Sequence, residues 1–428
     1  MNAAASPLAR PHIPDRMAAE LADPQVHASE RIHEIFSWLR ANEPLGIAAP
    51  DNFVPFWVVT KQRDLRIIAT MREHFFNADR IILIDLASEQ RMQELLGGRQ
   101  FPIRTILQMD PPDHAKYRAL TAERFQPRAV DALTRSIQGI AKDFVDRMLE
   151  KGGTCDFAAD VAFAYPLRVI MSILGVPVED EPTILRLTQQ FFGSSDKEFA
   201  HAEASKTAGD ALAAVTDDFN AFFDALFTER RAKPREDVLS LIANGKVDGK
   251  PVPQHEQRSY AAHLATAGHD TTSSVISAGV LAWCRDPALF KQLKADASLM
   301  PAFVEEAIRF GTASKITMRT VVADVHACDR DFRKGDWVAM AWASGNRDDD
   351  YVEDPHTFRI DRKPNRLISF GHGAHVCLGQ YLARLEMRML FTELLTRLDS
   401  VELAGEPRTM SSLIVSGLKT LPIRFRPS

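Results

Sequence analysis

The sequence predicts a mainly α-helical protein with small β-sheets. Apolar residues recur at helical spacing through most of its 428 residues. Residues 257–283 are apolar on nearly all sides, which is typical of a buried helix, so we expect a long central helix there. Stretches with strand character are short and lie at residues 56–60, 316–325 and 337–342. Because no linker, repeat or low-complexity stretch interrupts the pattern, we expect residues 1–428 to form a single domain.

The other elements follow from the same signals. Periodic apolar patterns predict helices over residues 30–40, 113–151 (interrupted near Pro127), 158–174, 184–192 and 206–232. The polar residues 193–205 predict a mobile connection between two of these helices. Residues 348–370 predict a long coil, and one helix and a hairpin should complete the chain.

Composition and charge exclude several classes of protein. The chain is 45% hydrophobic and has a net charge of −5, which gives no sign of nucleic-acid binding. The four cysteines, Cys155, Cys284, Cys328 and Cys377, show no zinc or redox spacing, so we expect free thiols in a reducing, cytoplasmic environment. The first 50 residues contain neither a signal-peptide pattern nor an apolar run of the roughly 18 residues that a membrane span needs. We therefore expect no membrane attachment.

The most informative segment surrounds Cys377. It reads Phe-Gly-His-Gly-Ala-His-Val-Cys-Leu-Gly over residues 370–379, and a helical apolar pattern follows it. A thiol at the start of a helix faces unpaired N–H groups and the positive end of the helix dipole, and both favour the thiolate. The glycines leave room for a flat ligand, so this thiolate suits axial ligation of a haem iron.

Two other interpretations of Cys377 compete with ligation. A cysteine is often a small buried hydrophobic residue. His375 and Cys377 could instead form the base and nucleophile of a hydrolase. Against the hydrolase, the sequence shows no nucleophile-elbow context and no third residue to orient the histidine.

The centre of the long helix contains residues that form helices poorly. Gly268 costs about 1 kcal/mol relative to alanine inside a helix. The side chains of Asp270 and Thr271 compete for backbone hydrogen bonds. These residues predict a functional kink, and the alternative is a polar cluster that fills a gap in the core.

Taken together, these segments resemble the cytochrome P450 family. The cysteine loop matches Phe-Gly-x-Gly-x-His-x-Cys-x-Gly, residues 267–271 match Ala-Gly-x-Asp-Thr, and Glu306-x-x-Arg309 precedes the segment Asp354–Arg362 in the family's order. The resemblance covers nearly the whole chain and is to the soluble bacterial class. It implies the cytochrome P450 fold, with haem b between the long central helix and the helix after the cysteine loop. It also implies a monooxygenase that inserts one oxygen atom of O2 into a C–H bond.

The resemblance further implies roles for individual residues. Cys377 would be the axial thiolate ligand of the haem iron, while Asp270 and Thr271 would deliver protons to dioxygen. Glu306, Arg309 and Arg362 would form a structural network. The residues expected to bind the haem propionates are His114, Arg118, Arg319 and His375. The expected substrate pocket comprises Phe191, Phe192, Ala267, Ile316, Thr317, Ile414 and Val415.

Substrate and partner expectations come from the same source. A lining with few charges predicts a small apolar substrate, either a monoterpenoid or an aromatic hydrocarbon. Electrons would come from a [2Fe–2S] ferredoxin and its NADH-dependent reductase. The expected docking patch consists of Lys116, Arg124, Arg128, Arg384 and Arg388. A peroxide-using relative would lack the acid–alcohol pair, and a haem sensor would not turn over with reductant.

The chain departs from the family's pattern in two places. Residues 312–314 lack a proline that is common there, which could reshape the pocket. Cys328 and Asp329 stand where a glycine turn is usual.

Overall fold

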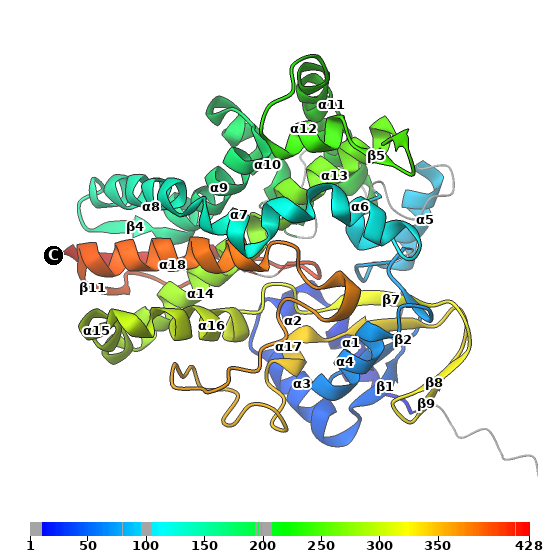
Figure 1. The fold of residues 1–428 in the computed structure, drawn as a ribbon. Coiled ribbons are helices and arrows are strands. Elements are labelled where there is room, and N and C mark those ends of the chain that lie inside the picture. Colours follow the sequence, from blue (N-terminus) through cyan, green and yellow to red (C-terminus); the bar gives the residue numbers. More distant parts are fainter. Residues whose placement is uncertain are drawn as a thin grey trace, which may run out of the picture.

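The computed structural model describes residues 11–78, 80–95, 104–192, 196, 198, 208–415 and 417–428. Figure 1 shows a body of helices above a smaller, sheet-containing part. The polar connection expected at residues 193–205 lies almost entirely outside the described residues.

The helices are mostly short to medium in length. The α-helices are α1 (Asp15–Leu21), α2 (Pro24–His27), α3 (Arg31–Asn42), α4 (Gln62–Thr70), α5 (Leu86–Leu95), α6 (Asp113–Ala122), α7 (Pro127–Asp131), α8 (Thr134–Leu149), α9 (Ala164–Leu174), α10 (Glu181–Phe192), α11 (Ala208–Ala232), α12 (Val238–Ala243), α13 (Gln254–Ala267), α14 (Asp270–Arg285), α15 (Pro287–Ala295), α16 (Met300–Phe310), α17 (Trp342–Gly345) and α18 (Gln380–Arg397). Single turns of 3-10 helix are η1 (Ile106–Gln108), η2 (Glu123–Phe125), η4 (Val178–Asp180), η5 (Ala297–Leu299) and η6 (Gly373–His375), and η3 (Ala158–Ala162) is a π-helical turn.

The strands are β1 (Leu45–Ala48), β2 (Phe56–Val59), β3 (Phe75–Phe76), β4 (Thr154–Asp156), β5 (Lys246–Val247), β6 (Lys250–Pro251), β7 (Thr317–Val321), β8 (Val325–Ala327), β9 (Arg330–Phe332), β10 (Trp337–Met340), β11 (Leu398–Leu403), β12 (Arg408–Thr409), β13 (Leu418–Thr420) and β14 (Pro422–Pro427). The largest sheet among them has the order β1-β2-β10-β7-β3. Strand β10 runs parallel to β2, with Trp337 opposite Phe56, and antiparallel to β7.

Alternate residues of β2 pack on opposite faces of this sheet, as strand geometry requires. Phe56 and Val58 join the cluster that contains the apolar residues of α3. Trp57 and Val59 join a second cluster with the apolar residues of α4. Both faces are therefore covered, which explains why residues 56–59 are buried throughout.

The expected central helix is two helices, α13 and α14, which meet at Gly268 and His269. A Cβ atom at Gly268 would lie 2.9 Å from the side chain of Ile170 on α9, so close packing requires glycine here. His269 has φ −101° and ψ −76°, which breaks the regular helix. The kink predicted from Gly268, Asp270 and Thr271 is therefore confirmed, and the long central helix expected over residues 257–283 is present as α13 and α14 on either side of it.

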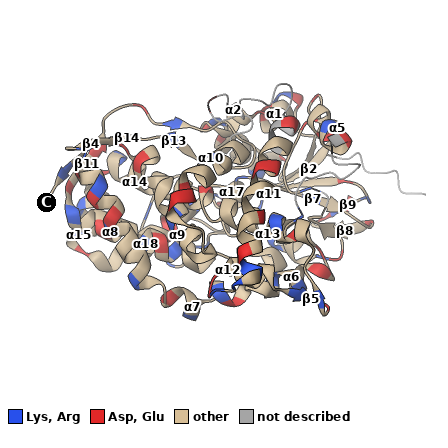
Figure 2. Ribbon diagram, turned by 90° about the horizontal axis from the view of Figure 1, so that it is seen from above, with Lys and Arg blue, Asp and Glu red and all other residues tan. Residues whose placement is uncertain are grey.

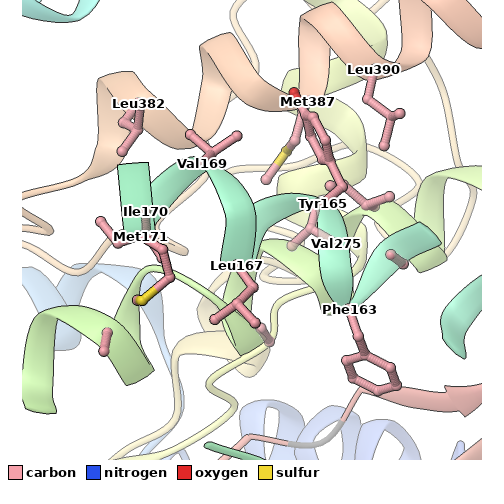
Figure 3. Packing of buried hydrophobic residues seen from close by; sticks show 14 of the residues in the cluster. Phe163, Tyr165, Leu167, Val169, Ile170, Met171, Val275, Leu382, Met387 and Leu390 are labelled. Atoms are coloured by element: carbon pink, nitrogen blue, oxygen red, sulfur yellow. The ribbon is translucent and has the colours of Figure 1, made fainter. Parts of the chain in front are cut away.

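The helical core surrounds α9, most of whose residues are buried. Figure 3 shows residues of α9 close to Val275 of α14 and to Leu382, Met387 and Leu390 of α18. A hydrogen bond also joins α9 to α18, because the Tyr165 hydroxyl donates to the carbonyl oxygen of Glu386 at 2.9 Å. The packing holds the kinked central pair of helices against α18, the helix that follows Cys377.

Candidate active site

The Cys377 loop is held by its own backbone. The Cys377 N–H donates to Phe370 O at 2.9 Å, and the Val376 N–H donates to Gly373 O at 3.2 Å. Gly373 has a φ of 75°, and a Cβ atom there would collide with the carbonyl oxygen of Ala69 on α4. Glycine is therefore required to close the loop against α4.

Burial raises the pKa of the Cys377 thiol, and the Gly379 N–H, Arg118 and Arg384 offset this only in part. The sequence predicts that the helix terminus favours the thiolate. The structure differs because α18 begins at Gln380, three residues after the cysteine, and the sulfur is desolvated. A metal cation deprotonates a coordinating thiol outright, so a metal would supply what the loop alone does not.

A cavity of about 320 Å³ lies between this loop and the junction of α13 and α14. Its wall contains Cys377 and the Gly371–Phe370 turn on one side, and Gly268 and Thr271 on the other. All seven residues expected to form a substrate pocket lie on this wall: Phe191, Phe192, Ala267, Ile316, Thr317, Ile414 and Val415. The lining is mainly apolar, and Cys377 is its only described cysteine.

Two arginines reach the cavity wall without a carboxylate partner. Arg319 is only 7% exposed, and its guanidinium donates to Met318 O at 2.8 Å. Arg118 donates to Val376 O at 2.8 Å. Among the described residues, no carboxylate lies within ion-pair distance of either guanidinium. Burial lowers the pKa of Arg319 to about 10, so both residues remain cationic at neutral pH and can receive an anionic group.

The two expected histidines stack on each other beside these arginines. The rings of His114 and His375 have centroids 4.1 Å apart. His375 lies on the cavity wall, whereas His114 lies behind it and does not line the cavity. His114 Nε2 and His375 Nδ1 are buried and have no hydrogen-bond partner among the described residues. Burial lowers the pKa of His114 to about 4, which keeps that ring neutral.

Asp270 and Thr271 begin α14 and point to different surroundings. Thr271 lies on the cavity wall, and its hydroxyl donates to Ala267 O at 2.9 Å, across the kink. Asp270 is 2% exposed and does not line the cavity. Its Oδ2 atom lies 3.1 Å from Nδ1 of His269.

Glu306 is the centre of a buried network on α16. Its carboxylate accepts two bonds from Arg309, at 2.8 and 2.6 Å, and one from Arg362 at 3.1 Å. The Arg359 N–H and the Asn365 amide also donate to it, at 2.8 and 3.0 Å. The structure therefore brings together the three residues that the sequence grouped.

Asn346 extends this network toward the cysteine loop. Its amide donates to Thr312 and Ser369, each at 2.7 Å, and its carbonyl oxygen accepts from the Ile368 N–H at 2.6 Å. Ser369 directly precedes the cysteine loop and donates to Ile308 O of α16 at 2.8 Å. Asn346 is not predictable from the sequence, because a single buried asparagine carries no periodic or spacing signal.

Other cavity residues were also missed. They are Ile81, Ile82, Ile106, His263, Val275, Trp342 and Glu386, among others. Glu386 is buried on α18, and burial raises the pKa of its carboxyl well above the ordinary range. The Ile81-Ile82 pair was the one available signal, because it is an apolar pair outside any periodic element.

Comparison with known proteins defines the class. The cytochrome P450 family model matches residues 80–425. The chain belongs to the cytochrome P450 family. It is a monooxygenase, its cofactor is haem with a cysteine thiolate ligand, and it needs O2 and redox partners.

Individual relatives match over nearly their full length. The chain is 40% identical to cytochrome P450-terp of Pseudomonas sp. over 423 residues, which is 97% of this chain and 99% of the relative. It is 32% identical to cytochrome P450 NovI of Streptomyces niveus, covering 95% of this chain and 96% of the relative. The crystal structure of CYP108D1 from Novosphingobium aromaticivorans matches with a TM-score of 0.90 at 38% identity, over 98% of this chain and 100% of that one. These likenesses confirm the predicted fold, mainly helical with small sheets.

Proposed function

We propose that this enzyme hydroxylates a small apolar molecule, a monoterpenoid or an aromatic hydrocarbon, at a C–H bond. The observation that carries the proposal is the apolar cavity wall between Cys377 and Thr271, to which the aromatic rings of Phe191 and Phe192 contribute. Such a wall binds apolar ligands favourably, because their surface leaves water, and binds ligands with unpaired polar groups unfavourably. The likeness to P450-terp supports the terpenoid class, as does the structure of Mycobacterium marinum CYP268A2 in complex with pseudoionone, which matches with a TM-score of 0.88 at 28% identity, over 98% of this chain and 100% of that one.

The residues around Cys377 fit haem b. Cys377 would supply the thiolate ligand, because it is the only described cysteine on the cavity wall. Arg118 and Arg319 are cations without carboxylate partners on the cavity wall, and His375 has a buried ring nitrogen without a partner, so these three would hold the two propionates. His114 would support them from behind the wall, because its ring stacks on that of His375. When bound, the haem supplies the oxygen-activating chemistry, which the thiolate's electron donation favours.

The remaining site residues would supply protons or hold the cysteine loop in place. Thr271 would present its hydroxyl to the cavity, and the buried Asp270 beside it would pass protons to that hydroxyl. Glu306, Arg309 and Arg362 would fix the cysteine loop through Asn346 and Ser369. In this way the chain orients the substrate, limits water and controls when a proton arrives.

A [2Fe–2S] ferredoxin with an NADH-dependent reductase would deliver the electrons. Arg124, Arg128 and Arg388 are exposed. Helix α7 carries Arg128 and packs against α18, which carries Arg388 (Figure 2). Lys116 and Arg384 contribute less than the sequence suggested, because Asp248 and Glu305 pair with them. Opposite charge on the ferredoxin would steer its approach to this face.

We also propose a cytoplasmic location for this reaction. The four cysteines are free thiols, which fits a reducing compartment. No described helix is long and apolar enough to cross a membrane.

Reconstituted turnover tests the proposed function. The purified enzyme is supplied with NADH, a bacterial [2Fe–2S] ferredoxin and its reductase, and with a panel of monoterpenoids, alkylbenzenes, fatty acids and steroids. Products are identified by mass spectrometry under labelled O2. We expect one labelled oxygen atom in a hydroxylated monoterpenoid or alkylbenzene. Hydroxylation of only the fatty acids or steroids would refute the substrate class, and turnover with peroxide but not with NADH would refute the electron route.

A further inference from the structure

His269, which lies in the kink between α13 and α14, has no role in the function described above. The ring is fully buried, and three oxygen atoms surround its two nitrogens. Nε2 lies 2.7 Å from Phe163 O, at the start of α9. Nδ1 lies 2.9 Å from the hydroxyl of Thr188 on α10 and 3.1 Å from Oδ2 of Asp270.

Counting protons restricts the state of this group. A carbonyl oxygen only accepts, so Nε2 carries a proton and donates it to Phe163 O. In a neutral ring Nδ1 is then a bare acceptor. The Thr188 hydroxyl has one proton, and its oxygen also lies 3.0 Å from Leu185 O, which can only accept. When Thr188 donates to Leu185, Nδ1 faces oxygen lone pairs on both sides.

An ionised Asp270 makes this arrangement costly. Its Oδ2 is buried and has no other hydrogen-bond partner among the described residues. A bare carboxylate oxygen 3.1 Å from a bare nitrogen is repulsive, and burying the carboxylate without a donor is strongly unfavourable. One additional proton satisfies every contact. It lies either on Nδ1, donated to Asp270 and Thr188, or on Asp270, donated to Nδ1.

We propose that His269 and Asp270 share one proton in addition to the one on Nε2, and that this pair is the proton reservoir from which Asp270 supplies Thr271. The inference rests on the proposed role of Asp270 and Thr271 and deepens it. In each delivery one proton leaves the pair toward the Thr271 hydroxyl, that hydroxyl releases its own proton to the cavity, and solvent restores the proton of the pair. No electron moves in this step.

The position of the pair explains why a reservoir is useful. Asp270 is 2% exposed and His269 is fully buried, so bulk water has little access to the pair and restores its proton more slowly than it would for an exposed group. The hydrogen bond to Thr188 ties the pair to α10, which also contributes Phe191 and Phe192 to the cavity wall. His269 is a positioning and storage residue, since it does not touch the cavity itself.

Spectroscopy of the intact haem protein tests where the proton is. Ring-nitrogen NMR of the diamagnetic, reduced CO complex, with histidine labelled by ¹⁵N, should show His269 with Nδ1 sharing a proton. The signal is assigned by its loss in His269→Asn. Infrared difference spectra between wild type and Asp270→Asn report a protonated carboxyl if the proton lies on Asp270. A bare Nδ1, together with no protonated carboxyl band lost in Asp270→Asn, overturns the proposal.

Turnover variants test whether the stored proton is used. His269→Asn keeps an amide near Nδ1 but cannot carry the extra proton. We expect product per reductant to fall by about a hundredfold or more, which is the range for loss of an acid–base group, and the solvent deuterium effect on product formation to rise. The control is His326→Asn, which removes an exposed histidine whose Nδ1 lies 2.8 Å from Asp331, a similar pair in contact with water. It should behave as wild type.

Wild-type coupling in His269→Asn would overturn the inference, because an amide that only positions Asp270 would then suffice. The proposed function fails by different results: no thiolate CO spectrum, or no hydroxylated product from wild type. A normal spectrum and normal product with an unaffected His269→Asn refutes only the reservoir.

Discussion

Removing the charge of Glu306 should destabilise the protein far more than removing that of its neighbour Glu305. Glu306 is fully buried and accepts from five donors, including two from Arg309 and one from Arg362. Glu306→Gln leaves both guanidinium groups without their carboxylate and turns an amide N–H toward them. Removing one partner of a buried ion pair costs about 3–5 kcal/mol.

Glu305→Gln is the matched control on the same helix. Glu305 pairs with Arg384 at the surface, and its side chain is 30% exposed. Such a pair contributes about 0–1 kcal/mol. The two substitutions change the net charge equally and differ by one position, so the expected difference of about 2–5 kcal/mol isolates the buried network.

Equilibrium denaturation in guanidinium chloride, followed by circular dichroism and by haem absorbance, measures this difference. We expect a lower midpoint for Glu306→Gln at an unchanged slope. Haem absorbance should be lost before secondary structure, since the network reaches the cysteine loop through Asn346 and Ser369. Equal midpoints for Glu306→Gln and Glu305→Gln would refute the reasoning.

Three further predictions concern protons, electrons and haem retention. Thr271→Ala removes the hydroxyl at the cavity wall, so NADH consumption should continue while peroxide replaces the hydroxylated product. Asp270→Asn should slow NADH consumption. Full coupling of NADH consumption to product in Thr271→Ala would count against the proton relay. Arg128→Glu and Arg388→Glu should slow reduction of the enzyme by ferredoxin. Added salt should slow reduction of wild type, because screening at 0.15 M weakens charge interactions beyond about 8 Å. A reduction rate that changes with neither salt nor either variant would refute the proposed docking face. Arg319→Met should speed transfer of haem to apomyoglobin roughly tenfold to a hundredfold, since a charge-assisted hydrogen bond is worth about 1.5–3 kcal/mol; an unchanged transfer rate would remove Arg319 from the propionate site.

The fold was predictable from the sequence where local signals were strong. The helices at α3, α9 and α10 lie where the apolar periodicity placed them. Residues 113–151 became α6, η2, α7 and α8 because Pro127 starts a new helix rather than continuing the old one. Poor helix formers predicted the break of the central helix at Gly268. The close approach of Ile170 on α9 to Gly268 could not be predicted, because a sequence pattern does not contain contacts between distant helices.

Some residues of the site were predictable from the sequence and others were not. Motif residues such as Cys377 and Thr271 could be named from spacing, and the structure places them on one cavity wall. His269 was visible only as a variable position inside a motif. Its partners Phe163 and Thr188 are distant in sequence, so their contacts exist only after the helices assemble. The pKa of the Cys377 thiol is raised and not lowered as the sequence predicts, because burial by the whole fold outweighs the effect of the local helix terminus.

The central claim is that Cys377 supplies the thiolate ligand of the haem. The most direct measurement is the absorption spectrum of the reduced, CO-bound protein, taken for wild type and for Cys377→Ser at matched haem content. We predict that wild type shows the red-shifted Soret band characteristic of thiolate ligation and that Cys377→Ser lacks it. The same red-shifted band in Cys377→Ser, or its absence from wild type, would contradict the claim.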